Sequence, residues 1–476
     1  MGRGFILHKK KRAYIIKPKI DYEKNHSTKE LQILIDECSE SGGGEIHFEQ
    51  GCYVLSTVFL KSNVSIVIGK GVHILGSLNF NDYHMDERVD YPLYQDASHS
   101  FFHCSLFVGI DCENISIVGE GTIDMRSVWD NENKRNMVHR GAKCIALKGC
   151  RNVELKEVSI YNATDLAVYF AGCDNVVIDG LTLRVHIDGI SPDNSKNVVI
   201  RNCNVESGDD GIVFKSSYVL NHLDICQNIL VENCKVKSRC NALKFGTETN
   251  GGFENISIQN IYVYDTRLAG ICIESIDGAV IDNIRITDIT MKNVATPIFL
   301  HLGKRLRGPK GVGIGTIENI LLENIRAEGP YEPYECIEWN YKSYLKKDNI
   351  QYPWFINLSA RDIPSDVQEL RNFPWQTTSN ICGLKNFPLK NITLRNIDLN
   401  MEGGVQSFLG NVSEEPLSTY PEVFVYGKIL PAKGIYFRYI DGLLIENVKV
   451  KSYLSDKRED FVFNKVENLL HIKNYG

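Results

Sequence analysis

The sequence predicts an all-β solenoid, in which short strands stack coil upon coil. A pattern of Asn followed by alternating aliphatic residues recurs, as in Asn175-Val-Val-Ile and Asn197-Val-Val-Ile. The spacing is 22 or 23 residues where the repeat is tightest. Short β-patterned runs at such a period are typical of solenoid coils. Other copies begin at Asn114, Asn152, Asn228, Asn255, Asn283, Asn319 and Asn391, with a Gly442 variant.

The repeated Asn predicts a ladder of stacked side chains at a turn. A second register aligns between the Asn positions, and strand alternation points one of its columns into the core and the next column outward. The outward column mixes polar and apolar groups, as a sugar-binding floor or an ordinary solvated sheet face would. The inward column is Val168, Ile190, Ile212, Leu243, Ile271 and Ile298, and the outward column is Tyr169, Ser191, Val213, Lys244, Cys272 and Phe299.

The N-terminal end of a solenoid needs a cap, because an open end exposes its core. Residues 27–38 predict a capping helix, with a capping box of Ser27 and Glu30 and an apolar stripe. We therefore divide the chain into an N-terminal arm, residues 1–26, and a β-helix domain, residues 27–476. Long insertions are expected at about 330–386, which is rich in aromatic residues, and at about 404–436. Such loops bind substrates or partners, or cover a small satellite core.

Composition and charge narrow the functional classes. The chain has 476 residues, 43% hydrophobic and 24% charged, and a formal net charge of -6. This balance disfavours non-specific nucleic-acid binding, and no stretch approaches the roughly 18 apolar residues of a membrane span. The basic N-terminus lacks the apolar segment of a secretion signal, so we expect a cytoplasmic protein whose 14 cysteines are reduced thiols. The sequence leaves the oligomeric state open.

Two acidic segments lie one repeat apart. Asp188 stands in His-Ile-Asp-Gly-Ile, and Asp209 and Asp210 stand in Ser-Gly-Asp-Asp-Gly-Ile. The solenoid should therefore stack the three carboxylates on one face, although strict alternation would bury two of them at high cost. The adjacent glycines Gly189 and Gly211 predict a bend with unusual backbone angles. Enzymes that hydrolyse glycosidic bonds use carboxylates grouped in this way as acid and base.

These segments resemble glycoside hydrolase family 28, the polygalacturonase-like enzymes. Residues 42–48 (Gly-Gly-Gly-Glu-Ile-His-Phe) resemble the first coils of the family, and residues 118–124 resemble its Gly-x-Gly-x-Ile-Asp segment. Residues 207–212 are similar to its Gly-Asp-Asp element, and residues 186–188 take the place of its Asn-Thr-Asp. The resemblance covers most of the chain and implies a single-stranded right-handed parallel β-helix with glycosidase activity.

Two segments depart from the family pattern. Cys240-Asn241-Ala242 stands for Gly-His-Gly, and Cys272-Ile273-Glu274 stands for Arg-Ile-Lys. In polygalacturonases that Arg and Lys hold the substrate carboxylate, so their loss argues against a standard endo-polygalacturonase. Other residues on the face should bind substrate, and Lys244 is favoured because its column places it outward one coil after Asp210. The candidate substrate-binding residues are His186, Lys215, Arg239, Asn241, Lys244, Arg267, Glu274 and His301.

The resemblance implies that Asp209 is the general acid and that Asp188 and Asp210 hold and deprotonate water. Inverting enzymes separate acid and base by about 6.5–9.5 Å, and β-helix coils rise by roughly 4.8 Å, so acids on neighbouring coils can meet that separation. Mutual repulsion should raise at least one of the three pKa values. We expect no metal ion and no cofactor.

The predicted function is an inverting glycosidase, exo-acting on pectic (galacturonic-acid-containing) or related oligosaccharides. An oligosaccharide is the expected partner. One alternative is a polysaccharide lyase that would use Asp188, Asp209 and Asp210 as calcium ligands. The other alternative is a non-catalytic, glycan-binding β-helix.

Overall fold

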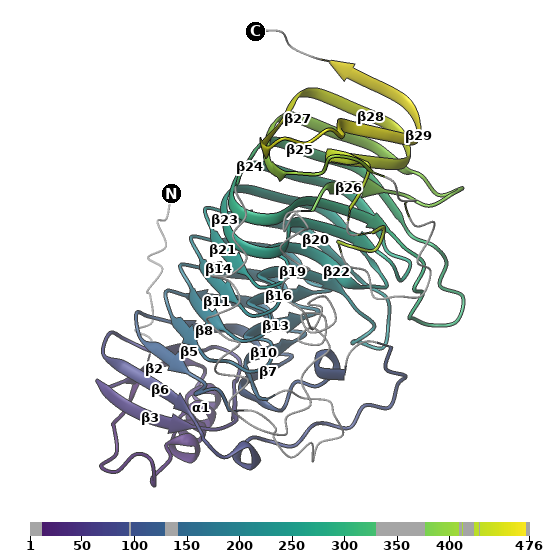
Figure 1. The fold of residues 1–476 in the computed structure, drawn as a ribbon. Helices are drawn as coiled ribbons and strands as arrows, with labels where there is room; N and C mark the ends of the chain where they lie inside the picture. The colour runs from purple at the N-terminus through teal and green to yellow at the C-terminus, as the bar shows by residue number, and fades with distance from the viewer. Residues whose placement is uncertain are drawn as a thin grey trace, which may run out of the picture.

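The computed structural model is a solenoid of parallel strands with helix α1 at its N-terminal end (Figure 1). Strands between the first and last coils pair in parallel with strands one coil earlier and one coil later. The predicted right-handed parallel β-helix is confirmed. The structure describes residues 12–94, 97–128, 141–329, 377–408, 412, 423–427 and 429–472.

The strands recur in the same order in each coil and form three faces. The first face contains β1 (Arg12–Ile16), β2 (Gly44–Phe48), β5 (Val64–Val67), β8 (Glu113–Val118), β11 (Arg151–Lys156), β14 (Asp174–Asp179), β17 (Lys196–Arg201) and β20 (Ile225–Glu232). The second contains β3 (Gly51–Leu55), β6 (Val72–Gly76), β9 (Thr122–Asp124), β12 (Ser159–Tyr161), β15 (Thr182–Val185), β18 (Asn204–Ser207) and β21 (Lys235–Ser238). The third contains β4 (Val58–Phe59), β7 (Ser105–Ile110), β10 (Lys143–Lys148), β13 (Val168–Ala171), β16 (Ile190–Asp193), β19 (Ile212–Ser216), β22 (Leu243–Thr249) and β26 (Ser379–Cys382).

Toward the C-terminal end the strands lengthen and continue around the corners between faces. The predicted inward column on the third face is confirmed, because its residues pair coil by coil and are buried in one continuous apolar core. Burying one such side chain contributes roughly 1.5–3 kcal/mol, so this column is a main source of coil-to-coil stability. The long strands are β23 (Gly252–Ser275), β24 (Val280–Leu302), β25 (Thr316–Glu328), β27 (Leu389–Gly403), β28 (Ala432–Leu454) and β29 (Glu459–Ile472).

Asn side chains form the predicted ladder along the first face. Asn175 has a φ of 56° and its Nδ2 donates to Asn152 Oδ1 at 2.8 Å, while Asn152 Nδ2 donates to Asn114 Oδ1 at 2.9 Å. A second ladder, which the sequence analysis missed, lies at the next corner, where Asn260 Nδ2 donates to Asn233 Oδ1 at 2.6 Å. Asn suits both ladders because it tolerates the left-handed conformation and bonds to its copy in the adjacent coil.

Asn175→Ala is expected to lower the free energy of unfolding by about 1–2 kcal/mol. The lost hydrogen bond contributes about 1 kcal/mol, and Ala lacks the short polar side chain with which Asn tolerates the left-handed conformation. Asn175→Gly loses the hydrogen bond but tolerates the backbone angle, so it should lose less stability. Urea unfolding followed by circular dichroism measures both variants. Equal losses would contradict a conformational role for Asn175.

Helix α1 (Thr28–Glu40) covers the N-terminal coil with an apolar stripe, as predicted. Leu31, Ile35 and Cys38 are fully buried against the core. A helix is needed here because the first coil is open at its end. The helix shields the apolar interior of that coil from water. Beyond the helix, Gly42 and Gly43 take positive φ values of 91° and 99° and lead into β2.

The predicted capping box at the start of α1 is wrong. Ser27 makes no side-chain cap hydrogen bond, and the Glu30 carboxylate lies 3.3 Å from Lys19 Nζ instead. Ser27 has φ -94° and ψ 3°, outside the extended conformation from which a cap hydroxyl reaches the helix N–H groups. Its own N–H donates to Val54 O of the coil, which fixes that backbone.

The predicted N-terminal arm and the two predicted insertions can be compared with the strands of the structure. Within the predicted arm 1–26, β1 pairs with β2 and extends the first face. Residues 330–376 of the first insertion lie outside the described residues, whereas β26 near its end joins the third face. The second insertion, about 404–436, overlaps the start of β28 at Ala432. The domain limits themselves stay predictions.

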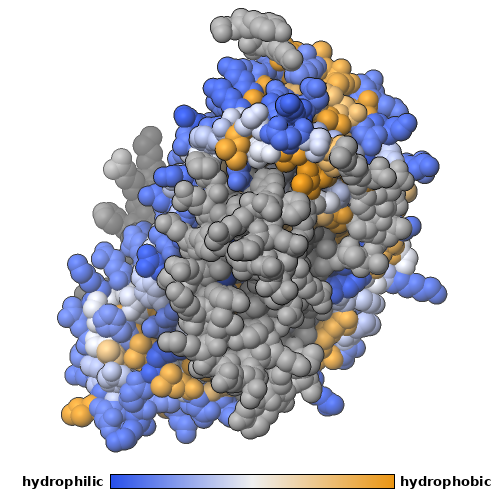
Figure 2. Space-filling view, viewed as in Figure 1, coloured by the Kyte–Doolittle hydropathy of each residue, from blue (hydrophilic) through white to orange (hydrophobic). Residues whose placement is uncertain are grey.

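The described cysteines, including the buried Cys203 and Cys234, are free thiols, in agreement with the prediction. No helix in the described ranges is both long enough and apolar enough to cross a membrane. Apolar surface gathers near the C-terminal coils in Figure 2. Exposed apolar residues of the last two strands are Tyr453, Leu454, Leu469, Leu470 and Ile472.

Candidate active site

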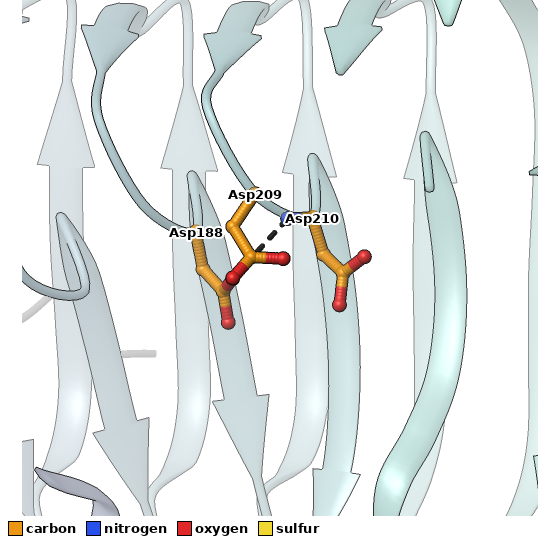
Figure 3. A group of neighbouring side chains, drawn as sticks. All are labelled: Asp188, Asp209 and Asp210. Carbon is orange, nitrogen blue, oxygen red and sulfur yellow. Dashed lines mark hydrogen bonds between the residues drawn. The ribbon is translucent and has the colours of Figure 1, made fainter. Parts of the chain in front are cut away.

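Asp188, Asp209 and Asp210 lie together on two neighbouring coils. One carboxylate oxygen of each lies within 4.8 Å of the other two. The three residues follow β15 and β18 of the second face and precede β16 and β19 of the third, so they occupy one corner. Figure 3 shows their side chains on the same side of this corner, with Asp210 N donating to Asp188 Oδ1 at 3.2 Å. The predicted grouping follows from the one-repeat offset.

The trio lies outside the apolar core of the solenoid but is not exposed to solvent. The chain bends at the corner, as predicted, and the three aspartates are 4%, 6% and 4% exposed. The outer face is therefore not the solvated surface that alternation alone predicts. The reason is that segments distant in sequence pack on it to either side of the trio. One apolar cluster contains Phe102, Leu166, Tyr169, Ile187 and Val219, and the other contains Cys240, Leu268, Cys272, Phe299 and Val423.

The glycines beside the aspartates are needed for close approach, not for unusual angles as predicted. None of Gly189, Gly208 and Gly211 has a left-handed φ. A Cβ on Gly189 would lie 2.6 Å from Gly211 O, and one on Gly211 would lie 2.6 Å from Ala242 O. Backbone oxygens of the next coil thus occupy the space of a side chain, which lets the coils stack tightly at this corner.

A buried lysine and glutamate hold Asp188. Lys215 Nζ lies 3.4 Å from Asp188 Oδ2 and 3.1 Å from Glu248 Oε2. Burial lowers the pKa of Lys215, but Glu248, Asp188 and Asp210 more than reverse this, so its pKa lies above the usual range. Burial raises the pKa of Glu248, and Lys215 and His99 more than offset it, so that pKa lies well below its usual value. The pair is charged at neutral pH. The sequence analysis missed Glu248, although alternation from Lys244 along β22 points to it.

Lys244 and Asn241, predicted to bind substrate, both contact Asp210. Lys244 Nζ lies 3.0 Å from Asp210 Oδ2 and 4.0 Å from Glu274 Oε2. The Asn241 side chain donates to Asp210 Oδ1 at 2.9 Å and accepts from Ala269 N at 3.1 Å. Burial raises the pKa of Glu274 to about 7, although Lys244 lowers it. Lys244 and Asn241 of the following coil thus hold the Asp210 carboxylate in place.

His186 and Arg239 occupy equivalent corner positions to either side of Gly208. The His186 ring hydrogen-bonds with Ser127 Oγ at 2.8 Å. Burial and the nearby Arg239 lower the pKa of His186 to about 4, so the ring is neutral at pH 7. Arg239 and Arg267 are half-buried and follow one another on successive coils.

The structure does not bring His301 to the trio. It lies one coil beyond Glu274 in register and bonds through Nδ1 with Tyr426 Oη at 2.7 Å. Burial and Arg438 lower its pKa to about 3. Its ring stacks on Phe299, so it helps to attach the segment containing Tyr426 to the outer face.

A parallel β-helix with grouped carboxylates on an outer corner indicates the class of enzymes that cleave polysaccharides. The chain belongs to the glycosyl hydrolases family 28, whose sequence model matches residues 38–333, and it is a glycosidase. The predicted family resemblance is thus confirmed.

Known proteins are distant relatives of the chain. It is 22% identical to a probable polygalacturonase of Vitis vinifera, over 78% of this chain and 82% of the relative. It is 24% identical to an endo-polygalacturonase of Pectobacterium carotovorum subsp. carotovorum, over 58% of this chain and 71% of the relative. Its fold matches an exopolygalacturonase of Thermotoga maritima with a TM-score of 0.63 and 17% identity, over 83% of this chain and 89% of that one.

Proposed function

We propose that the protein is an inverting glycosidase, exo-acting on pectic, galacturonic-acid-containing or related oligosaccharides. The observation that carries the proposal is the aspartate trio at one corner, with oxygens within 4.8 Å. Asp209 gives its proton to the glycosidic oxygen as the bond from that oxygen to the anomeric carbon breaks. Asp188 and Asp210 hold a water and take its proton as the water oxygen bonds to the anomeric carbon from the opposite side.

The number of carboxylates supports inversion. The oxygen spacing of at most 4.8 Å does not meet the roughly 6.5–9.5 Å expected between the acid and base of an inverting enzyme, and it is closer to the roughly 5–5.5 Å of retaining enzymes. A retaining mechanism, however, employs only an acid and a nucleophile. A third carboxylate has a role when two of them hold one water between adjacent coils. The contacts of Lys215 with Asp188 and of Lys244 with Asp210 offset the negative charge of this pair in a buried place.

The cover over the outer face supports exo action. Tyr169 Oη donates to His99 O on the N-terminal side of the trio, and Tyr426 bonds with His301 on the C-terminal side. A long polymer lying along the coils would meet both covers, whereas a chain end can enter between them. The names of the curated relatives and the half-buried Arg239 and Arg267 support a pectic substrate that contains uronate.

The test is to incubate the purified protein with a panel of pectic oligosaccharides and follow the products by proton NMR. We expect saturated sugars, released from one chain end, whose first anomer is inverted relative to the substrate. A retained anomer would contradict inversion, mid-chain fragments would contradict exo action, and unsaturated products would indicate a lyase. The Asp209→Asn variant is the control for contaminating activity.

A further inference from the structure

Glu274 places a carboxylate oxygen without a hydrogen-bond donor on the outer face. Its side chain is 1% exposed, and its Oε2 has no hydrogen-bond partner among the described residues. The nearest cation, Lys244 Nζ, is 4.0 Å away, beyond hydrogen-bond distance. A buried acceptor without a donor is unfavourable, and its carboxylate form more so. This oxygen therefore has an unused capacity to accept a hydrogen bond from a ligand.

Glu274 is linked to the trio through Lys244. Lys244 pairs in register with Cys272, so Glu274 projects from the coil that follows Lys244. The Lys244 ammonium bridges this coil to Asp210 Oδ2 at 3.0 Å. A sugar that extends from the trio toward the C-terminal coils thus passes over Lys244 and reaches Glu274. The next coil in the same direction carries His301, which bonds with Tyr426.

The charges around Glu274 do not suit a second carboxylate. The ammonium groups of Lys215 and Lys244 already contact four carboxylates of the site. Arg305, on the neighbouring loop, is held by Asp277 through its Nε at 3.0 Å. A uronate placed here would face the carboxylate of Asp210 and the ionised form of Glu274, whose pKa is about 7, as like charges. The carboxylates of the site are Asp188, Asp209, Asp210, Glu248 and Glu274.

We propose that Glu274 determines specificity: the sugar ring bound over it carries no carboxylate and donates a hydroxyl to Oε2. The bond that is cleaved then joins this neutral ring to a second ring, which lies on the other side of the trio. This inference rests on the proposed glycosidase function and names the substrate class within it.

The test uses digalacturonate and its two singly carboxyl-reduced forms, in which one ring or the other is galactose. We expect wild-type kcat/KM to be at least about 10-fold higher for one reduced form than for digalacturonate, since a hydrogen bond to a charged group contributes roughly 10- to 100-fold. Glu274→Gln should lower the ratio of kcat/KM for the preferred reduced form to kcat/KM for digalacturonate, mainly through a higher KM for the preferred form. Glu274→Lys should shift the preference toward digalacturonate. Glu254→Gln, on the same strand but on the first face, should leave the ratio unchanged.

The outcomes separate the two proposals. Equal or better cleavage of digalacturonate by the wild type, or an unchanged ratio in a folded Glu274→Gln, overturns the role of Glu274 and leaves the glycosidase intact. If the wild type cleaves none of the three, calorimetric binding to Asp209→Asn decides. Preferred binding of a reduced form then supports the Glu274 inference and overturns the proposed reaction. Gln matches Glu in shape, so this variant remains informative if Glu274→Lys fails to fold.

Discussion

Asp209→Asn should lower kcat by about 10²- to 10⁴-fold, the range that general acid catalysis supplies, without unfolding the protein. The amide cannot give a proton to the glycosidic oxygen but keeps the shape of the carboxyl. The backbone oxygen of Asp209 accepts from Ser207 Oγ at 2.8 Å and from Ser238 Oγ, and neither bond involves the substituted group. Initial rates of reducing-end release measure the effect, and the thermal midpoint measures the fold.

A substrate with an acidic leaving group gives a sharper test of the role of Asp209. An aryl glycoside needs little proton transfer to its leaving oxygen, so Asp209→Asn should lose much less activity on it than on an oligosaccharide. Asp188→Asn should lose activity on both, because water must still be activated. The exposed Asp90→Asn is the matched control and should behave as wild type. Near-normal turnover of the oligosaccharide by Asp209→Asn would assign the acid to another residue.

The repeat made the fold and the grouping of the acids predictable. Strand alternation and a period of one coil are local properties, and they place Val168 beside Ile190 and Asp188 beside Asp210 whatever else packs on the solenoid. The ladder Asn residues carry a similarly local signal, since their positive φ and their bonds to the next coil depend on one residue type.

The environment of the acids could not be predicted because it depends on contacts between distant segments. Tyr169 is covered by residues near position 99, and Phe299 and His301 by residues 423–426. Alternation along β22 points to Glu248, but counting columns from coil to coil does not reach it, because the pairing of β19 with β22 shifts register between Phe214 and Ser216. Simple column counting does not carry across such a shift.

Lys215→Met should lower the free energy of unfolding by about 3–5 kcal/mol, the usual effect of removing one partner of a buried ion pair. The substitution leaves Asp188 and Glu248 buried without the ammonium that lies 3.4 and 3.1 Å from them. Lys196→Met is the matched control, because Lys196 pairs with Asp224 at 2.9 Å with 38% and 27% of the two side chains exposed. Such exposed pairs contribute about 0–1 kcal/mol. Urea unfolding compares the two variants.

The pH dependence and a second substitution distinguish an uncompensated charge from a packing defect. In Lys215→Met the buried carboxylates favour their protonated forms, so the stability loss should shrink as the pH falls from 7 toward 4. Lys215→Met combined with Glu248→Gln should recover part of the loss, because one buried anion is removed. If the losses in the free energy of unfolding are additive and do not change with pH, the effect of Lys215→Met comes from a packing defect. Activity should stay low in the double variant, since Asp188 still lacks the cation that holds it beside Asp210.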